Sequence, residues 1–432
     1  MGKVFCLYST GSIVVYVILG LIVTAYGFGN PSSSIPKQKV LEVERKLKQL
    51  RRHSLKTIQS EDGDIIDCVD IRKQPAFDHP ALKDHKIQMA PTRNVSRERT
   101  ASVKRTKSKM VNLSAEESTF INVTSQVWQK SGRCPQGTIP IRRIRKKQLL
   151  KAHSIEDYGR KKPSIFHQTA QLNRDLDSFV RENYSKAMLF AVGFRYLGAK
   201  ADFLVFNPYV ETEDEYSTTQ VALFNGGSYD HECVEAGWAV NPGVYGDKTT
   251  RLFVYWTADG SNTTGCFDLT CPGFVQTSNE IALGAAISPI SLPGDLGPSM
   301  TIYIYKDPVT SNWWVQYGEK DIGYWPPELF QDIRYNAESV EWAGEVYSTR
   351  VGQIPHTKTQ MGSGMYPDGT CFDCGTFTRM RVHDNSPFLK IPEFADAYTD
   401  EYRCYGAEFM SDYLDDPIFH YGGPGMSWTC PL

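Results

Sequence analysis

The chain has 432 residues, and its 47 Lys and Arg nearly balance its 49 Asp and Glu. That length is enough for two or more domains with a sizeable core. The sequence contains no phosphate-binding P-loop, no dinucleotide-binding glycine fingerprint, no G-x-S-x-G serine motif and no H-E-x-x-H zinc motif. The enzyme classes that these motifs mark are therefore excluded as first interpretations.

The N-terminus has the layout of a secretory signal. Lys3 precedes an apolar run over residues 12–25, and small residues and Pro31 follow it. This layout is typical of a signal peptide that is removed, so we assign residues 1–28 to it and expect a secreted protein without stable membrane association. A retained signal anchor is the alternative, because the apolar run extends toward Phe28 and approaches the length of a membrane span.

The cysteines and glycosylation motifs fit that route. Cys266 and Cys271 flank a four-residue loop, and Cys404 and Cys430 lie close in the C-terminal segment, so we expect two disulfides. The C-x-x-C at residues 371–374 resembles half a zinc site, but no second half accompanies it. We expect a local disulfide or two free thiols there, and no metal. Candidate glycosylation sites are Asn94, Asn112, Asn122, Asn183 and Asn262.

Opposite charges divide the chain into two parts. Residues 31–162 carry 30 Lys and Arg against 14 Asp and Glu, a net charge of +16, and residues 163–432 carry 16 against 35, a net charge of −19. Within the basic part, 29–162, the apolar spacing predicts an amphipathic helix over 40–58, and the polar composition of 91–130 predicts a flexible linker.

The basic part has two possible roles besides that of a solvated linker. Nucleic-acid binding is one, but no nucleic-acid-binding motif is present and a secreted protein rarely meets such a partner. We therefore interpret the basic part as an intramolecular inhibitor that covers a groove of the acidic domain. Acidification weakens that attraction by protonating carboxylates, and the basic clusters at 142–147 and 160–162 are candidate cleavage sites.

The acidic part, residues 163–432, is predicted to be an all-β domain. From about residue 187, short runs rich in Val, Ile, Phe, Tyr and Trp alternate with turn signals such as Asn-Gly-Gly and Ala-Asp-Gly. Helical periodicity is scarce. Many short strands at this spacing favour an antiparallel sandwich or barrel over βαβ units.

Two glutamates stand out in this domain. Glu235 in HECVEAGWAV and Glu345 in ESVEWAGEVYS each lie among Gly, Ala and Trp in a predicted strand, where glutamate is uncommon. Side-chain alternation puts each carboxylate on the small-residue face, where a groove can form. Ordinary surface glutamates are the alternative interpretation. Candidate groove-lining residues are Trp238, Tyr255, Trp256 and Gln360.

Many motifs of the chain, in order, resemble the neprosin family of plants. They include DGDIIDCVDIRKQPAFDHP, CPQGTIPIRR, VEAGW, YGDKTTRLFVYWTADG, TGCFDLTCPGFVQ, NWWVQYG, VEWAGEVYS, HTKTQMGSG and YGGPG. The resemblance implies a secreted zymogen with an activation peptide. It also implies a jelly-roll-like β-sandwich related in design to glutamic peptidases, and acid cleavage of peptide or protein substrates after proline. The extracellular cell wall, the apoplast or the vacuole is the implied location.

By the same resemblance, Glu235 of VEAGW and Glu345 of EWAGEV form the catalytic pair. Glu341 is the rival for the second position, because it lies on the same face four residues away; the Gly-Glu-Val context favours Glu345. The expected disulfides match the family's pairs. A carboxylate pair hydrolyses peptides by activating water, without metal or cofactor. A non-catalytic cell-wall binding protein and a glycosidase, which also uses paired carboxylates, are the alternatives.

Overall fold

The computed structural model describes most of the chain and divides it into two compact units, Met1–Glu42 and Val43–Leu432. Of the first unit only residues 36–42 are described, so the account below concerns the second. Among the described residues, no helix is long and apolar enough to span a membrane. The expected signal peptide and the sequons at Asn94, Asn112 and Asn122 lie outside them. The described residues are 36–92, 97–98, 124–152, 154–163, 166–168, 179–181, 183–227, 230–292, 297–368, 373–386, 388–411 and 414–430.

One sheet of seven strands carries both glutamates. Its neighbouring strands all run antiparallel. In spatial order the strands are β13 (Cys266–Phe267), β12 (Arg251–Thr257), β11 (Glu232–Val240), β10 (Tyr216–Asn225), β19 (Ala337–Tyr347), β8 (Tyr184–Tyr196) and β22 (Ala395–Thr399).

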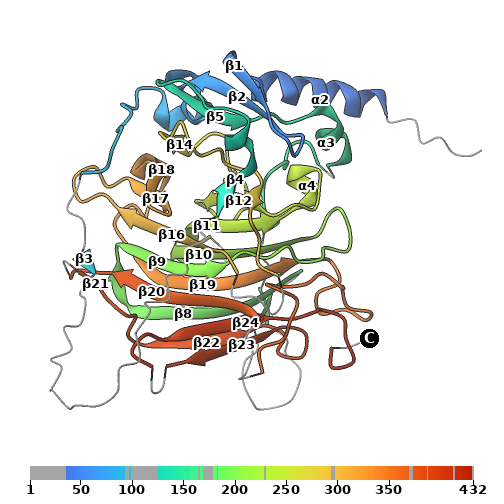
Figure 1. Ribbon diagram of the computed structural model, residues 1–432, viewed down its shortest axis with the longest axis vertical. Coiled ribbons are helices and arrows are strands. Elements are labelled where there is room, and N and C mark those ends of the chain that lie inside the picture. Colours follow the sequence, from blue (N-terminus) through green and yellow to red (C-terminus); the bar gives the residue numbers. More distant parts are fainter. Residues whose placement is uncertain are drawn as a thin grey trace, which may run out of the picture. The chain divides into compact units, whose positions relative to one another are not determined.

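A second antiparallel sheet of eight strands packs against the first, and Figure 1 shows the green and orange strands of the two sheets in layers. In spatial order the strands are β14 (Val275–Gln276), β18 (Lys320–Trp325), β17 (Trp313–Tyr317), β16 (Ser299–Lys306), β9 (Gly198–Leu204), β20 (Gly375–His383), β24 (Ile418–Gly422) and β23 (Gly406–Met410).

Alternating side chains from both sheets form one core. Val234, Ala236 and Trp238 of β11 face it, together with Phe203 and Ile302 of the other sheet, and all are buried. The indole N–H groups of Trp238 and Trp342 in the first sheet donate to backbone carbonyls of β9, so these two side chains are buried with their polar atoms satisfied. The all-β, antiparallel sandwich expected from the sequence is confirmed.

The basic part folds as a small domain. Its three-stranded sheet consists of β1 (Ser54–Gln59), β2 (Ile65–Asp70) and β5 (Thr138–Arg142), the blue-to-teal strands of Figure 1. The helix expected over 40–58 was wrong in its second half: α2 (Lys37–Leu50) ends at Leu50, and 54–59 form β1. Ile58 lies in the small core of this domain, where pairing with β2 overrides the helical spacing.

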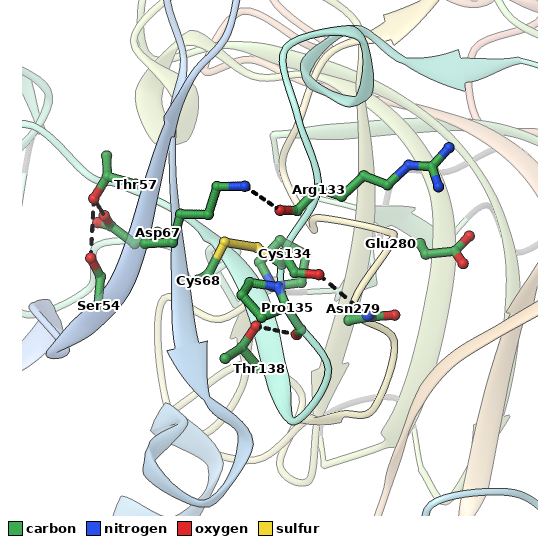
Figure 2. Close-up of a disulfide and its surroundings, with 12 residues drawn as sticks. Ser54, Thr57, Asp67, Cys68, Arg133, Cys134, Pro135, Thr138, Asn279 and Glu280 are labelled. Atoms are coloured by element: carbon green, nitrogen blue, oxygen red, sulfur yellow. Dashed lines mark hydrogen bonds between the residues drawn. A yellow bond between two sulfur atoms is a disulfide. The ribbon is translucent and has the colours of Figure 1, made fainter.

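A disulfide that was not assigned from the sequence closes this domain. Cys68 in β2 bonds to Cys134, 66 residues later in the chain. Figure 2 shows Asn279 of the sandwich domain donating a hydrogen bond to the Cys134 carbonyl, at 3.4 Å. The Cys68–Cys134 disulfide therefore joins the segments on both sides of residues 99–123. Both of these segments lie against the sandwich domain.

The remaining elements are short. Two α-helices, α3 (Lys146–Lys151) and α4 (Pro242–Tyr245), lie near the glutamate-bearing sheet. The paired strands are β4 (Ser125–Gln126) with β15 (Ile287–Ser288), β3 (Arg97–Glu98) with β21 (Phe388–Leu389), and β6 (Phe166–Gln168) with β7 (Phe179–Arg181). The 3-10 turns are Ile71–Lys73, Pro75–Asp78, Pro80–Leu82, Val127–Lys130 and Pro327–Leu329.

Candidate active site

The register of three strands sets where the glutamates lie. Strand β10 separates β11 from β19, and Ala222 of β10 is the partner of both Glu235 and Glu341. Glu345 lies four residues further along β19 than Glu341, opposite Thr218 of β10. Glu235 and Glu345 are therefore diagonal neighbours across β10 on the face that points away from the core, and their side chains must reach toward each other to meet.

The ammonium group of Lys161 lies between them. Its Nζ is 2.7 Å from Glu235 Oε2 and 2.9 Å from Glu345 Oε1. All three side chains are buried, with 4 to 7% of their surface exposed. The two carboxylate oxygens are thus at most the sum of these distances, 5.6 Å, apart. A single cation bridges the pair.

Electrostatic attraction holds this cation in its charged form. Burial lowers the pKa of Lys161, but the carboxylates of Glu235 and Glu345 and the hydrogen bond to Glu235 outweigh it and raise the pKa well above its ordinary value. The ring of Tyr255, centred 5.0 Å from Nζ, adds a cation–π contact. Lys161 therefore stays protonated throughout the acid and neutral range.

The chain around Lys161 is held in the groove by its own hydrogen bonds. The Phe267 N–H donates to the Gly159 carbonyl at 2.7 Å, and the Tyr184 hydroxyl donates to the Lys162 carbonyl at 2.6 Å. Before them, the Tyr158 hydroxyl donates to the Val244 carbonyl at 2.6 Å. A polypeptide segment, residues 158–162, thus already lies across the glutamate pair.

Different groups surround the two glutamates. The Tyr216 hydroxyl donates to Glu345 Oε1 at 3.1 Å. Lys186 is the cross-strand partner of Glu345. Its Nζ lies 3.7 Å from Glu345 Oε2 and 2.8 Å from Glu341 Oε2. Beside Glu235, the Cys233 thiol donates to Oε1 at 3.3 Å. Burial, reinforced by the negative charge of Glu235, raises the pKa of Cys233 well above its ordinary value, so this thiol stays neutral.

A cavity of about 200 Å³ opens beside the pair. Lys161, Lys186 and the three glutamates form part of its wall. Phe224, His231 and Ser339 line the side of the cavity toward the end of β10 and the start of β11. The glutamate pair therefore adjoins space that can receive a side chain of a bound molecule.

Two family models match the chain over most of its length. The neprosin activation peptide model matches residues 57–189, and the neprosin model matches residues 213–424. The chain belongs to the neprosin family. Membership makes it a peptidase that is produced with its own activation peptide, here the domain that supplies Lys161.

Several solved structures are similar to this chain. Scytalido-glutamic peptidase with a peptide-based transition state analogue shares 10% identity at a TM-score of 0.29 and covers 56% of this chain and 99% of its own. SCP-B, an Eqolisin family peptidase in complex with a tripeptide, shares 9% sequence identity at a TM-score of 0.28, and the match covers 57% of this chain and 99% of SCP-B. CG-16, an agglutinin from chicken liver, shares 10% sequence identity at a TM-score of 0.20, and the match covers 37% of this chain and 92% of CG-16. The assignment itself rests on the family models.

The candidate groove-lining residues separate into two groups. Tyr255 lies on the glutamate face, opposite Glu235, under the Lys161 ammonium. Trp238 and Trp256 are corrections: alternation puts both on the core side, where they are buried between the sheets. Gln360 exchanges hydrogen bonds with Tyr209 rather than with either glutamate.

The other expected site residues lie as follows. Disulfides join Cys266 to Cys271 and Cys404 to Cys430. Cys374 is disulfide-bonded, while Cys371 lies outside the described residues. Of the sequons, Asn262 is exposed and Asn183 is half-buried.

One cluster in the described part of the neprosin chain has the composition of a metal site. Ligand atoms of His356, Cys404 and Cys430 lie within 4.8 Å of one another. The two cysteines form a disulfide, however, and a disulfide offers no thiolate. This cluster therefore does not hold a metal ion in the oxidised protein.

The sequence interpretation did not find Lys161 or Lys186 as site residues. The sequence placed Lys161 only in a basic cluster that was interpreted as a cleavage site. In the structure, Lys161 instead forms buried ion pairs with both glutamates. Lys186, a charged residue, directly precedes the apolar run Ala187–Val192 of β8. That contrast was a usable signal, because a lysine is buried only when it is paired.

Proposed function

We propose that this protein is a secreted glutamic endopeptidase, made as a zymogen, in which Glu235 and Glu345 activate water. The observation that carries the proposal is the single ammonium group within hydrogen-bonding distance of both carboxylates. A water molecule bound at that position would contact both glutamates at similar distances. Two carboxylates that share one site are the equipment for acid–base hydrolysis.

The mechanism follows from the closeness of the pair. Two carboxylates at this distance do not both ionise easily, so the pair carries one proton over part of the acid range. The ionised glutamate takes a proton from water as the water oxygen bonds to the scissile carbonyl carbon. The protonated glutamate donates a hydrogen bond to the carbonyl oxygen and then transfers its proton to the leaving nitrogen as the C–N bond breaks.

The bound segment supports a peptide substrate. The end of a turn at Gly159 and the residues that follow it up to Lys162 lie against the sheet, and backbone carbonyls of this segment accept hydrogen bonds from Phe267 and Tyr184. This favours a peptidase over the glycosidase alternative. It also favours a peptidase over a non-catalytic binding protein, because the segment leads a cation directly to the carboxylate pair.

Acid releases the inhibitor in this proposal. Ordinary glutamate side chains are protonated below about pH 4.3, and a protonated pair no longer attracts Lys161. A buried ammonium without its counterions is destabilising by roughly 3–5 kcal/mol. The inhibitory segment then leaves the groove, and the exposed pair cleaves it or another chain.

Three finer points rest on the family resemblance and the sequence. We propose cleavage on the carboxyl side of proline, and secretion to the cell wall, the apoplast or the vacuole. We also propose a signal peptide over 1–28, an activation domain and linker over 29–162, and the mature peptidase over 163–432. That boundary is compatible with the sheet, because β8 begins at Tyr184 in the interior of the seven-stranded sheet.

The test is peptide hydrolysis by the acid-treated full-length protein between pH 3 and pH 7, on a quenched peptide that contains proline. Glu235→Gln and Glu345→Gln should each lower kcat at least 100-fold while the far-ultraviolet spectrum stays unchanged. Glu338→Gln, an exposed change on the same strand, is the matched control and should keep wild-type activity. Full activity in either active-site variant would refute the assignment.

A further inference from the structure

Gln220 lies at the centre of the candidate active site. It belongs to β10, between Gly237 of β11 and Ala343 of β19. On one side, Glu235 lies on β11 two residues before Gly237. On the other side, Glu345 lies on β19 two residues after Ala343. On the sheet, the midpoint of the glutamate pair is therefore the position of Gln220.

Gln220 is on the same face of the sheet as the glutamates. Its chain neighbours Thr219 and Val221 face the core, where the Thr219 hydroxyl contacts the Tyr421 hydroxyl and Val221 is part of the apolar cluster. Side chains alternate along a strand. The Gln220 amide therefore points to the side on which Lys161 bridges the pair.

The amide of Gln220 is buried and has no hydrogen-bond partner among the described residues. Its surface is fully covered, and neither Nε2 nor Oε1 has a partner there. An unsatisfied buried polar group costs about 1–3 kcal/mol. Such a group in a folded protein calls for an explanation, and a catalytic role is one such explanation.

The residues on either side leave the amide unobstructed. A Cβ on Gly237 would come within 1.9 Å of the Thr219 carbonyl oxygen and 2.8 Å of the Gln220 Cα, so only glycine fits there. Ala343, on the other side, carries a single methyl group. Neither neighbour offers a polar side chain that competes for the Gln220 amide.

We infer that Gln220 is a third catalytic residue, whose side-chain N–H donates a hydrogen bond to the scissile carbonyl oxygen of the substrate. The inference rests on the proposed function. As water bonds to the carbonyl carbon, the C=O π bond opens and its oxygen gains negative charge. The Gln220 N–H stabilises that charge beside the protonated glutamate. When the C–N bond breaks, the carbonyl re-forms and the glutamate proton goes to the leaving nitrogen.

Gln220→Met tests the inference, because methionine keeps the length of the side chain and removes its donors. In the acid-activated full-length protein, kcat should fall about 100- to 1000-fold with KM nearly unchanged, as for other lost oxyanion donors. The melting temperature of the zymogen should stay equal or rise, because an unpaired buried amide is removed. A structural role would instead lower the melting temperature and leave kcat intact.

Ser217→Ala is the matched control. Its hydroxyl is also buried without a partner among the described residues, but it lies on the core side of the same strand. It should keep wild-type kcat. Gln220→Asn, which retains an amide but shortens its reach, should lose kcat if the methionine variant does not fold.

The outcomes separate this inference from the proposed function. Wild-type activity that depends on both glutamates but survives in Gln220→Met with unchanged kcat would overturn the inference and leave the proposed function standing. A wild-type protein with no acid peptidase activity would overturn both.

Discussion

At the residue scale, the two glutamates of the site differ in the groups that remain near each carboxylate after Lys161 leaves. Glu345 keeps the Lys186 ammonium at 3.7 Å and the Tyr216 hydroxyl at 3.1 Å, whereas Glu235 keeps the neutral Cys233 thiol. A nearby cation favours the ionised form of a carboxylate, so Glu345 is expected to be the base and Glu235 the acid. Besides Lys161, the titratable groups that interact with Glu345 are Lys186, Tyr216 and Tyr184, and Glu235 and Glu341 line the same cavity.

If Glu345 is the base, Lys186 is expected to set the pH range of catalysis. Lys186→Met removes a cation that favours loss of a proton from the pair, so both limbs of the kcat/KM profile should move to higher pH, by about one unit. Glu341→Gln removes the negative charge that lies 2.8 Å from the Lys186 ammonium. This change should move both limbs of the profile to lower pH. The measurement is kcat/KM against pH for the acid-activated protein.

Lys186→Arg keeps the cation and serves as the control, with a profile close to the wild type. Shifts of the same sign in Lys186→Met and Glu341→Gln would contradict an electrostatic role. They would indicate that both changes simply disturb the sheet.

Sequence reasoning reached the glutamates but not their surroundings. Alternation along a single strand showed that Glu235 and Glu345 stand on small-residue faces. Only the register across β10 shows that Gln220 lies between them. That register joins residues more than 100 positions apart, such as Gln220 and Ala343, and no local pattern contains it.

At the element scale, the Cys68–Cys134 disulfide decides how the activation domain can be released. A cut anywhere between residues 69 and 133 leaves both pieces covalently joined. Only a cut beyond Lys161 frees the domain that blocks the glutamates. Acid activation should therefore give an activation domain that migrates as one species without reductant.

Gel electrophoresis with and without reductant checks this. A fragment that ends between residues 69 and 133 and separates from the rest without reductant would contradict the bond. Replacing both Cys68 and Cys134 by Ser should loosen the domain, so the zymogen should begin to hydrolyse peptide at a higher pH than the wild type does.

A second element, the loop closed by Cys266–Cys271, carries a buried acid. Burial raises the pKa of Asp268 to about 7, against hydrogen bonds from Tyr245 and the Val254 N–H. The ordinary value is about 3.9, so the folded protein holds this proton between about pH 4 and pH 7 while the unfolded chain does not. Stability then falls as the pH rises through that range.

The Asp268→Asn variant tests this sign. The wild-type unfolding free energy should drop by a few kcal/mol, about 4 at most, between pH 4 and pH 7. In Asp268→Asn, the unfolding free energy should drop much less between pH 4 and pH 7, because most of the wild-type drop comes from the proton on Asp268. Denaturant unfolding at both pH values measures it, and an equal drop in the two proteins would show that another group titrates.

The wrong part of the expected helix 40–58 shows a limit at this scale. Leucine spacing predicted a helix through Ile58, but strand β2 follows at once and pairs with 54–59. The gain from pairing and from burying Ile58 exceeds the small differences in helix propensity. Such a competition is decided by the partner strand, which the local sequence does not show.

At the scale of the whole molecule, the charge asymmetry predicted the inhibitory arrangement but not its mechanism. Ion pairs between the two parts include Lys151 with Glu213, which is more than 40% exposed on both sides and so contributes little. Asp64 of the basic part pairs with Arg251 of the acidic part, opposite to the overall charges. The buried contact of Lys161 with the glutamates is the one that the proposed function makes responsible for inhibition.

The most direct test of this account is the pH at which the full-length protein, purified at neutral pH, begins to hydrolyse a proline-containing peptide. The wild type should be silent at pH 7 and begin in acid, and Lys161→Met should begin about one pH unit higher, because the buried pair has lost its counterion. Lys162→Met, an exposed change in the same basic cluster, should match the wild type. An unchanged onset in Lys161→Met would contradict the claim that Lys161 holds the catalytic glutamates closed.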